Sequence, residues 1–188
     1  MATDFSISTF TSKFTSGGAR PNLFQITLTP PTGVTSTGSA NIKYHCRAAQ
    51  IPSSTVQTYE VPYFGRNVKH AGDREFTEFT TTFINDEDFQ MRTIFDNWMH
   101  KLNQHKSNKP GVNLGSRTSY TSTVTLETFK KVGTLDQKWE FKGCWPSGIS
   151  DIPLSWDTTN AIQEFTVTWQ YDFFTHDLKA QASSASGD

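Results

Sequence analysis

The sequence predicts a mainly β protein, an antiparallel β-barrel or sandwich of six to seven strands with one flanking α-helix. Aromatic residues make up 13% of the 188 residues, and threonine is abundant, a composition that favours sheet. Short segments of alternating apolar and polar residues recur between turn-forming residues. Only one long stretch carries the apolar spacing of a helix.

The first half of the chain contains the less regular strand candidates. The first strand is expected at residues 23–29, between prolines that enter and stop it. Residues 42–47 alternate apolar and polar side chains and predict a second strand. Residues 55–61 and 66–71 are expected to pair as a hairpin. Residues 75–84 then add a further strand with one wet face.

The one convincing helix is predicted near residues 86–104. Asn85 is a suitable N-cap, and the acidic residues 86–88 suit the positive end of a helix dipole better than they suit a cation site. Phe89 falls on the side opposite the apolar stripe. The stripe consists of Met91, Ile94, Phe95, Trp98 and Leu102.

Three strands are expected to end the fold, at residues 119–129, 138–145 and 163–174. In the second of these, Trp139, Phe141 and Trp145 are expected to share one face. The whole chain is then divided into a flexible N-terminal arm at 1–19, the β domain at 20–174 and a disordered C-terminal tail at 175–188. The apolar side chains of the arm dock either on their own domain or on a neighbouring copy.

Composition excludes several classes of function. Seventeen basic and eighteen acidic residues leave a net charge of −1, which argues against a dedicated nucleic-acid binder. No apolar run approaches the roughly 18 residues of a membrane span, and the N-terminus lacks the pattern of a secretory signal. Cys46 and Cys144 are therefore expected as reduced thiols, with a buried disulfide as the alternative.

Motifs for catalysis are missing from the sequence. It contains no dinucleotide-binding glycine motif, P-loop, zinc-protease motif or nucleophile elbow, so we expect no enzyme, no cofactor and no metal. His100 and His105 are five residues apart, a spacing that separates two rings on a helix unless the helix ends between them.

Six short motifs over residues 19–173 resemble, in the same order, the tail tube proteins of contractile-tailed bacteriophages (myoviruses). Each motif is weak alone, but the ordered set covers most of the chain. The motifs are Ala19-Arg20-Pro21-Asn22-Leu23-Phe24, Gly72-Asp73-Arg74, Asn85-Asp86-Glu87, Trp145-Pro146, Trp156-Asp157 and Asn160-Ala161-Ile162-Gln163-Glu164-Phe165-Thr166-Val167-Thr168.

The resemblance implies a small antiparallel β-barrel or sandwich flanked by a helix, similar to the inner-tube protein of type VI secretion systems. It implies a structural virion subunit, assembled in the host cytoplasm as stacked, hexameric rings inside a contractile sheath. The implied partners are further copies of the chain, the sheath protein, and the baseplate and tail terminator proteins. DNA is expected to pass through the lumen without specific binding. A carbohydrate- or ligand-binding β-sandwich is the alternative function.

Two sets of residues are expected to serve such a tube. Polar strand faces without basic residues suit the lumen, because lysine and arginine would hold DNA phosphates. Exposed apolar side chains suit contacts between subunits. The lumen candidates are Thr121, Thr123, Thr125, Glu127, Glu164, Thr166, Thr168, Gln170 and Asp172. The inter-subunit candidates are Phe5, Phe10, Phe14, Tyr59, Tyr63, Phe64 and Phe89.

Overall fold

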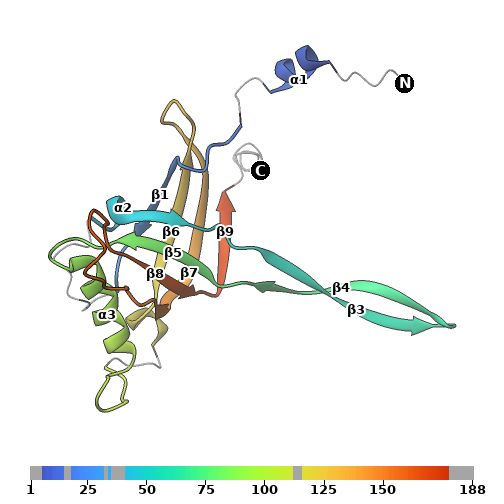
Figure 1. Ribbon diagram of the computed structural model, residues 1–188. Helices are drawn as coiled ribbons and strands as arrows, with labels where there is room; N and C mark the ends of the chain where they lie inside the picture. Colours follow the sequence, from blue (N-terminus) through green and yellow to red (C-terminus); the bar gives the residue numbers. More distant parts are fainter. Residues whose placement is uncertain (1–5, 15–17, 32–33, 35–40, 112–115, 178–188) are drawn as a thin grey trace, which may run out of the picture.

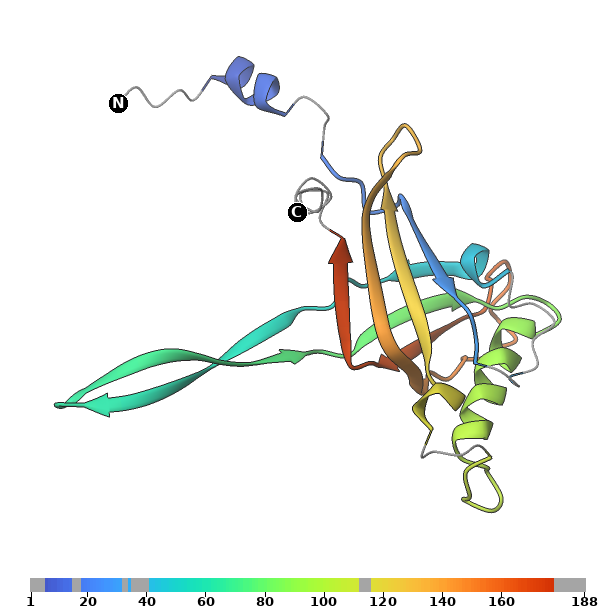
Figure 2. The same ribbon diagram turned by 180° about the vertical axis from the view of Figure 1, so that it is seen from behind.

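The computed structural model describes residues 6–14, 18–31, 34, 41–111 and 116–177. Strands dominate these residues, and all their pairings are antiparallel (Figures 1 and 2). In chain order the elements are α1 (Ile7–Lys13), β1 (Phe24–Leu28), α2 (Ile42–His45), β2 (Cys46–Ala49), β3 (Ser54–Tyr63), β4 (Arg66–Phe76), β5 (Phe79–Ile84), α3 (Gln90–Leu102), the 3-10 helix η2 (Arg117–Ser119), β6 (Ser122–Phe129), β7 (Leu135–Ile149), β8 (Glu164–Gln170) and β9 (Phe173–Asp177).

Seven of the strands form one sheet in the order β1-β6-β7-β8-β5-β2, with β9 paired to β7. The predicted mainly β, antiparallel fold with a flanking helix is therefore confirmed. Within the described residues the ladder does not close into a barrel, because β1 and β2 are the two ends of the strand order. Strands β3 and β4 form a separate hairpin that projects from the sheet, and α1 stands apart from it (Figure 1).

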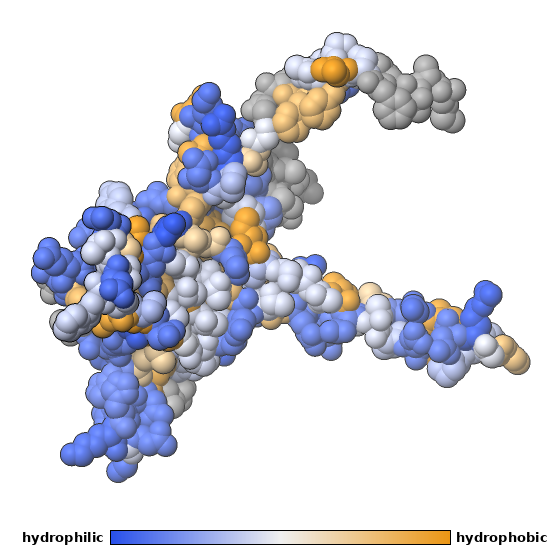
Figure 3. Space-filling model, viewed as in Figure 1, coloured by the Kyte–Doolittle hydropathy of each residue, from blue (hydrophilic) through white to orange (hydrophobic). Residues whose placement is uncertain are grey.

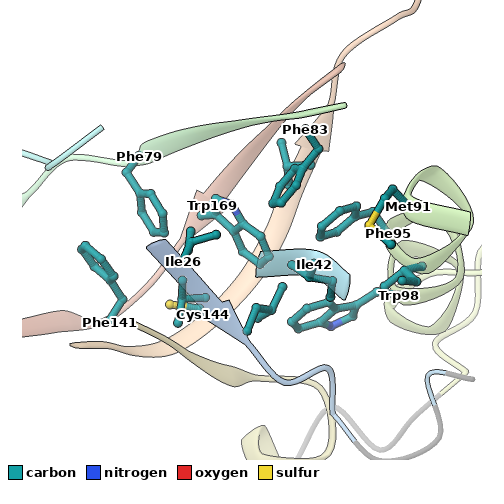
Figure 4. Close-up of a cluster of buried hydrophobic side chains, with 14 of the residues drawn as sticks. Ile26, Ile42, Phe79, Phe83, Met91, Phe95, Trp98, Phe141, Cys144 and Trp169 are labelled. Carbon is teal, nitrogen blue, oxygen red and sulfur yellow. The ribbon is translucent and has the colours of Figure 1, made fainter. Parts of the chain in front are cut away.

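The core lies between the inner face of the sheet and α3 (Figure 4). Trp169 of β8 is at its centre, with its ring 5.7 Å from that of Trp98 and 5.8 Å from that of Phe95 on α3. Phe83 of β5 packs against the same helix, 4.9 Å from Phe95. All four side chains are fully buried, and each burial contributes about 1.5–3 kcal/mol.

Helix α3 begins at Gln90, four residues after the predicted start. Asn85 is not its N-cap: it is buried, and its backbone N–H donates to the carbonyl of Gln163 at 2.9 Å. The Asp86 carboxylate takes the capping role, accepting bonds from the N–H groups of Gln90 at 2.7 Å and Met91 at 3.4 Å. The predicted apolar stripe is confirmed, because its members face the core.

Residues 42–47 are not the single strand that their alternation predicts. Ile42–His45 forms the short helix α2, and β2 begins at Cys46. Ile42 enters the core, whereas Tyr44 is 73% exposed. Ile42 and Tyr44 therefore do not share a buried face, although their spacing suggests one.

The long strand predicted at residues 163–174 is two strands. β8 ends at Gln170, and β9 begins at Phe173. The break lets the chain move from pairing with residues 145–149 of β7 to pairing with residues 138–142 of the same strand. β9 extends to Asp177; the rest of the predicted C-terminal tail, residues 178–188, lies outside the described residues.

A bulge at Gly143 reverses the side-chain alternation of β7. Gly143 has φ of +69°, and a Cβ there would lie 2.3 Å from a carboxylate oxygen of Asp172, so any other residue would be strained and would displace that carboxylate. Cys144 consequently enters the core, and Trp145 pairs with an outward-facing residue of β8. The prediction that Trp145 shares the face of Phe141 is wrong for this reason.

Candidate assembly surfaces

The hairpin β3–β4 is predicted by the sequence and is longer than expected. Its turn is Phe64-Gly65, with φ of +45° and +80°, the backbone region that a tight two-residue hairpin turn requires. Every residue of β3 is exposed. A two-stranded ribbon is marginally stable alone in water, so this hairpin gains most from a partner surface.

The two faces of this hairpin differ in polarity. The polar face carries Glu60, whose carboxylate lies 3.5 Å from the ammonium of Lys69. On the opposite face the ring of Tyr59 stacks on His70 with centroids 5.3 Å apart. Orange patches along the hairpin in Figure 3 mark its apolar residues. The opposed pairs of this apolar face are Tyr59 with His70, Val61 with Val68, and Tyr63 with Arg66.

Three of the predicted inter-subunit residues lie on this hairpin. Tyr59, Tyr63 and Phe64 are 55%, 67% and 92% exposed. The rings of Tyr63 and Phe64 meet edge to face at 4.6 Å, which gives the tip a compact aromatic end. The structure brings these three residues together on one projecting element.

Helix α1 and the residue that caps its C-terminal end carry two more of the predicted inter-subunit residues, Phe10 and Phe14. Their rings stack with centroids 5.4 Å apart, yet they are 67% and 52% exposed. Ile7, three residues before Phe10, is 84% exposed and lies on the same side of the helix. No residue of α1 is buried. The remaining predicted residue of this arm, Phe5, lies outside the described residues.

Phe89 is the last inter-subunit candidate and lies just before α3 rather than within it. Its φ is +55°, an uncommon conformation for a bulky side chain. Its carbonyl accepts bonds from both the N–H (3.0 Å) and the hydroxyl (2.7 Å) of Thr93, which hold this backbone in place. The ring is 47% exposed.

The predicted lumen residues of β6 and β8 lie on the outward face of one sheet. In each strand they alternate with core residues such as Val124 and Phe165. Two candidates lie outside these strands. Thr121 precedes β6 and donates its hydroxyl to the carbonyl of Arg117 at 2.8 Å. Asp172 lies in the break between β8 and β9, where its carboxylate pairs with the same arginine at 2.7 Å.

The predicted faces of β6 and β8 themselves carry no basic side chain, but β7, which pairs with β6, adds lysines to the same sheet face. Lys138 is opposite Glu127, and Glu140 is opposite Thr125, so all four side chains share the face. Glu140 accepts from Lys138 at 2.6 Å and from Lys142 at 2.7 Å. The alternation within β7 was visible in the sequence, but the strand order was not.

The charges on this face neutralise one another locally. Hydrogen bonds from Lys138 and Lys142 lower the pKa of Glu140 to about 2, and the bond to Glu140 raises the pKa of Lys138. Glu164 forms an ion pair with Arg47 of β2. The face is consequently rich in hydroxyl groups and paired charges.

Neither the thiols nor the histidines form a chemical site in the described residues. Cys46 and Cys144 are both free, and burial raises the pKa of each to about 12, which makes them poor nucleophiles. His100 and His105 do meet, with rings 5.2 Å apart, because α3 ends between them at Leu102. The described part of the chain holds no group of three or more metal-ligating side chains, and none of its helices could cross a bilayer.

Comparisons with known proteins point to one family. The family model described as phage tail tube protein matches residues 19–177. The tail tube proteins gp19 of Enterobacteria phages T6 and T4 are each 31% identical over 166 residues, which cover 87% of this chain and 96% of theirs. The fold is similar to a chain in the sheath–tube complex of an extracellular contractile injection system (PVC), with a TM-score of 0.60, 14% identity, and coverage of 92% and 97%.

Proposed function

The chain belongs to the phage tail tube protein family, and on that premise we propose how its surfaces build a tube. It is a structural subunit of a contractile-tailed virion and not an enzyme. The proposal is that copies form hexameric rings, that the rings stack, and that the genome leaves through the channel.

The observation that carries the proposal is the hairpin β3–β4. It projects away from its own core with one apolar face uncovered (Figures 1 and 3). A ring requires two different patches on each subunit, one for each neighbour, and stacking requires more. An apolar ribbon that reaches beyond its own domain supplies one such patch, and α1 with Phe89 supplies others.

We propose that the outward face of the sheet lines the channel. Its threonine hydroxyls offer no fixed positive charge, and its lysines are already bound to Glu140. An unpaired lysine would hold a DNA phosphate and resist sliding. Paired charges and hydroxyls therefore allow passage without specific binding.

We propose that α2 completes the enclosure of the core at the open side of the sheet. It contacts both end strands, β1 and β2, and buries Ile42. The sheet with this helix then acts as an incomplete barrel. The remaining surfaces are proposed to meet the sheath protein along the tube, and the baseplate and tail terminator proteins at its ends.

Polymerisation of hairpin variants tests the proposal. Tyr63→Ser combined with Phe64→Ser removes the aromatic tip, and Lys69→Ser is the matched control on the polar face. We expect the double variant to remain a folded monomer with an unchanged Tm while the control forms tubes in negative-stain electron microscopy. Tubes of normal length from the double variant would contradict the assignment of the hairpin.

A further inference from the structure

The loop at residues 150–163, between β7 and β8, has an apolar surface that the proposed function leaves unused. Leu154, Trp156 and Ile162 are 79%, 102% and 69% exposed. The loop is held in a defined path, since the N–H of Ser150 donates to the carbonyl of Thr166 at 2.8 Å and that of Thr158 to Ser155 at 3.3 Å. A large aromatic side chain that is fully exposed to water is typical of a site that contacts another molecule.

The charge of this loop has one sign. Asp151 and Asp157 are both exposed, and residues 150–163 contain no lysine, arginine or histidine. The loop is therefore an apolar patch beside negative charge. A partner that fits it would be apolar and basic.

Helix α1 and the residues that follow it have the complementary character. Ile7, Phe10 and Phe14 are exposed along one side, and Lys13 and Arg20 are exposed as well. Residues 6–20 contain no acidic side chain. Both segments therefore carry exposed aromatic side chains that can pack against each other, and their charges are of opposite sign.

The two segments are on opposite sides of the same molecule. In both Figure 1 and Figure 2, α1 stands beyond one end of the sheet, and the loop between β7 and β8 lies near α2 and α3 on the other side. A second copy is therefore the partner that can bring them together. This is the geometry of a head-to-tail contact, which propagates from subunit to subunit.

We propose that α1 of one copy docks on the loop 151–162 of a neighbouring copy, with Lys13 beside Asp157 and the phenylalanines against Trp156. This inference rests on the proposed function, because the contact exists only in the assembled tube. It assigns the partner of α1, which family membership does not.

Disulfide trapping between two variants that each carry one added cysteine tests the contact. Phe10→Cys protein and Trp156→Cys protein are mixed, assembled and oxidised, with each variant alone and the unchanged chain as controls. The native thiols give little background because burial suppresses their ionisation. We expect a cross-linked dimer only in the mixture and only under assembling conditions. Tubes without this dimer would overturn the inference and leave the proposed function intact, whereas a failure of the unchanged chain to form tubes would overturn the proposed function.

Charge reversal provides the second test. Lys13→Glu and Asp157→Lys, each alone, are expected to lower the yield of tubes several-fold at low salt, and the two combined are expected to restore it. Glu87→Lys, at an exposed carboxylate before α3, is the control for a nonspecific change of charge. Equal yields of tubes from all variants would overturn the pairing of Lys13 with Asp157. So would a double variant whose loss of yield equals the two single losses combined.

Discussion

The indole N–H of Trp169 donates a 2.8 Å hydrogen bond to the hydroxyl of Thr81. Both residues are at most 1% exposed, and the bond joins two neighbouring strands, β8 and β5, inside the core. The bond satisfies two polar groups that would otherwise be buried without a partner. It also fixes the indole ring against which Phe95 and Trp98 of α3 pack.

Thr81→Val should destabilise the subunit by about 1–3 kcal/mol, because the indole N–H loses its buried acceptor. Thr81→Ser retains the hydroxyl and should cost less. Thr82→Val, on the outward face of the same strand, is the control; it removes only a 3.3 Å, part-buried contact with the Thr166 hydroxyl and should cost less than Thr81→Val. Denaturant unfolding of the monomer measures all three. Equal losses for Thr81→Val and Thr82→Val would contradict this account of the core.

Acid should weaken the fold through Glu140. Its pKa is lowered to about 2 by Lys138 and Lys142, from an ordinary value of 4.5. The contribution of these bonds is therefore complete above about pH 4.5 and is lost as the pH falls toward 2. Since the cluster is partly exposed, the loss should be at most about 1 kcal/mol. Glu140→Gln should have a flatter dependence of unfolding free energy on pH in this window; identical pH profiles would refute the role of the cluster.

Phe89→Ala should impair polymerisation and leave the Tm of the monomer nearly unchanged. The ring is 47% exposed and lies outside the buried stripe of α3. Phe89→Asn is a useful second variant, because asparagine tolerates the positive φ and separates loss of the ring from backbone strain. A large fall in Tm for both variants would show that the ring stabilises the fold of its own subunit instead of a contact between subunits.

A new positive charge in the channel should slow DNA release. Thr125→Lys faces outward beside Glu140, so copies around a ring would create a band of positive charge. Tubes should form normally, while genome delivery slows, and added salt should reduce the effect. Thr125→Gln is the uncharged control. Normal genome delivery by virions that carry Thr125→Lys would show that this face does not line the channel.

Much of the fold could be predicted from local pattern, and the errors have common physical causes. The stripe of α3 and the hairpin were predictable because helical spacing and turn residues act within a few positions along the chain. At the bulge, Gly143 lies against Asp172 in the break before β9, a contact across strands that no local pattern reports. The helical turn at Ile42 shows that apolar alternation over only a few residues does not establish a strand.

The candidate surfaces were predicted less completely than the fold. The exposed aromatic residues of the hairpin and of the N-terminal arm could be identified because they lie among polar residues, outside the apolar patterns of the predicted core strands and helix. The composition of the polar face could not, because it depends on which strand pairs with β6. Lys138 and Lys142 lie on the part of β7 that has β6 on one side and β9 on the other, an arrangement that local sequence does not report.

Cryo-electron microscopy of tubes assembled from the purified chain tests the central claim most directly. A reconstruction that resolves side chains should show stacked rings with Thr125 and Glu127 facing the channel and the apolar face of the hairpin β3–β4 buried against another subunit. A map with hairpins free in solvent, or with β6 turned toward the outside of the tube, would contradict the account.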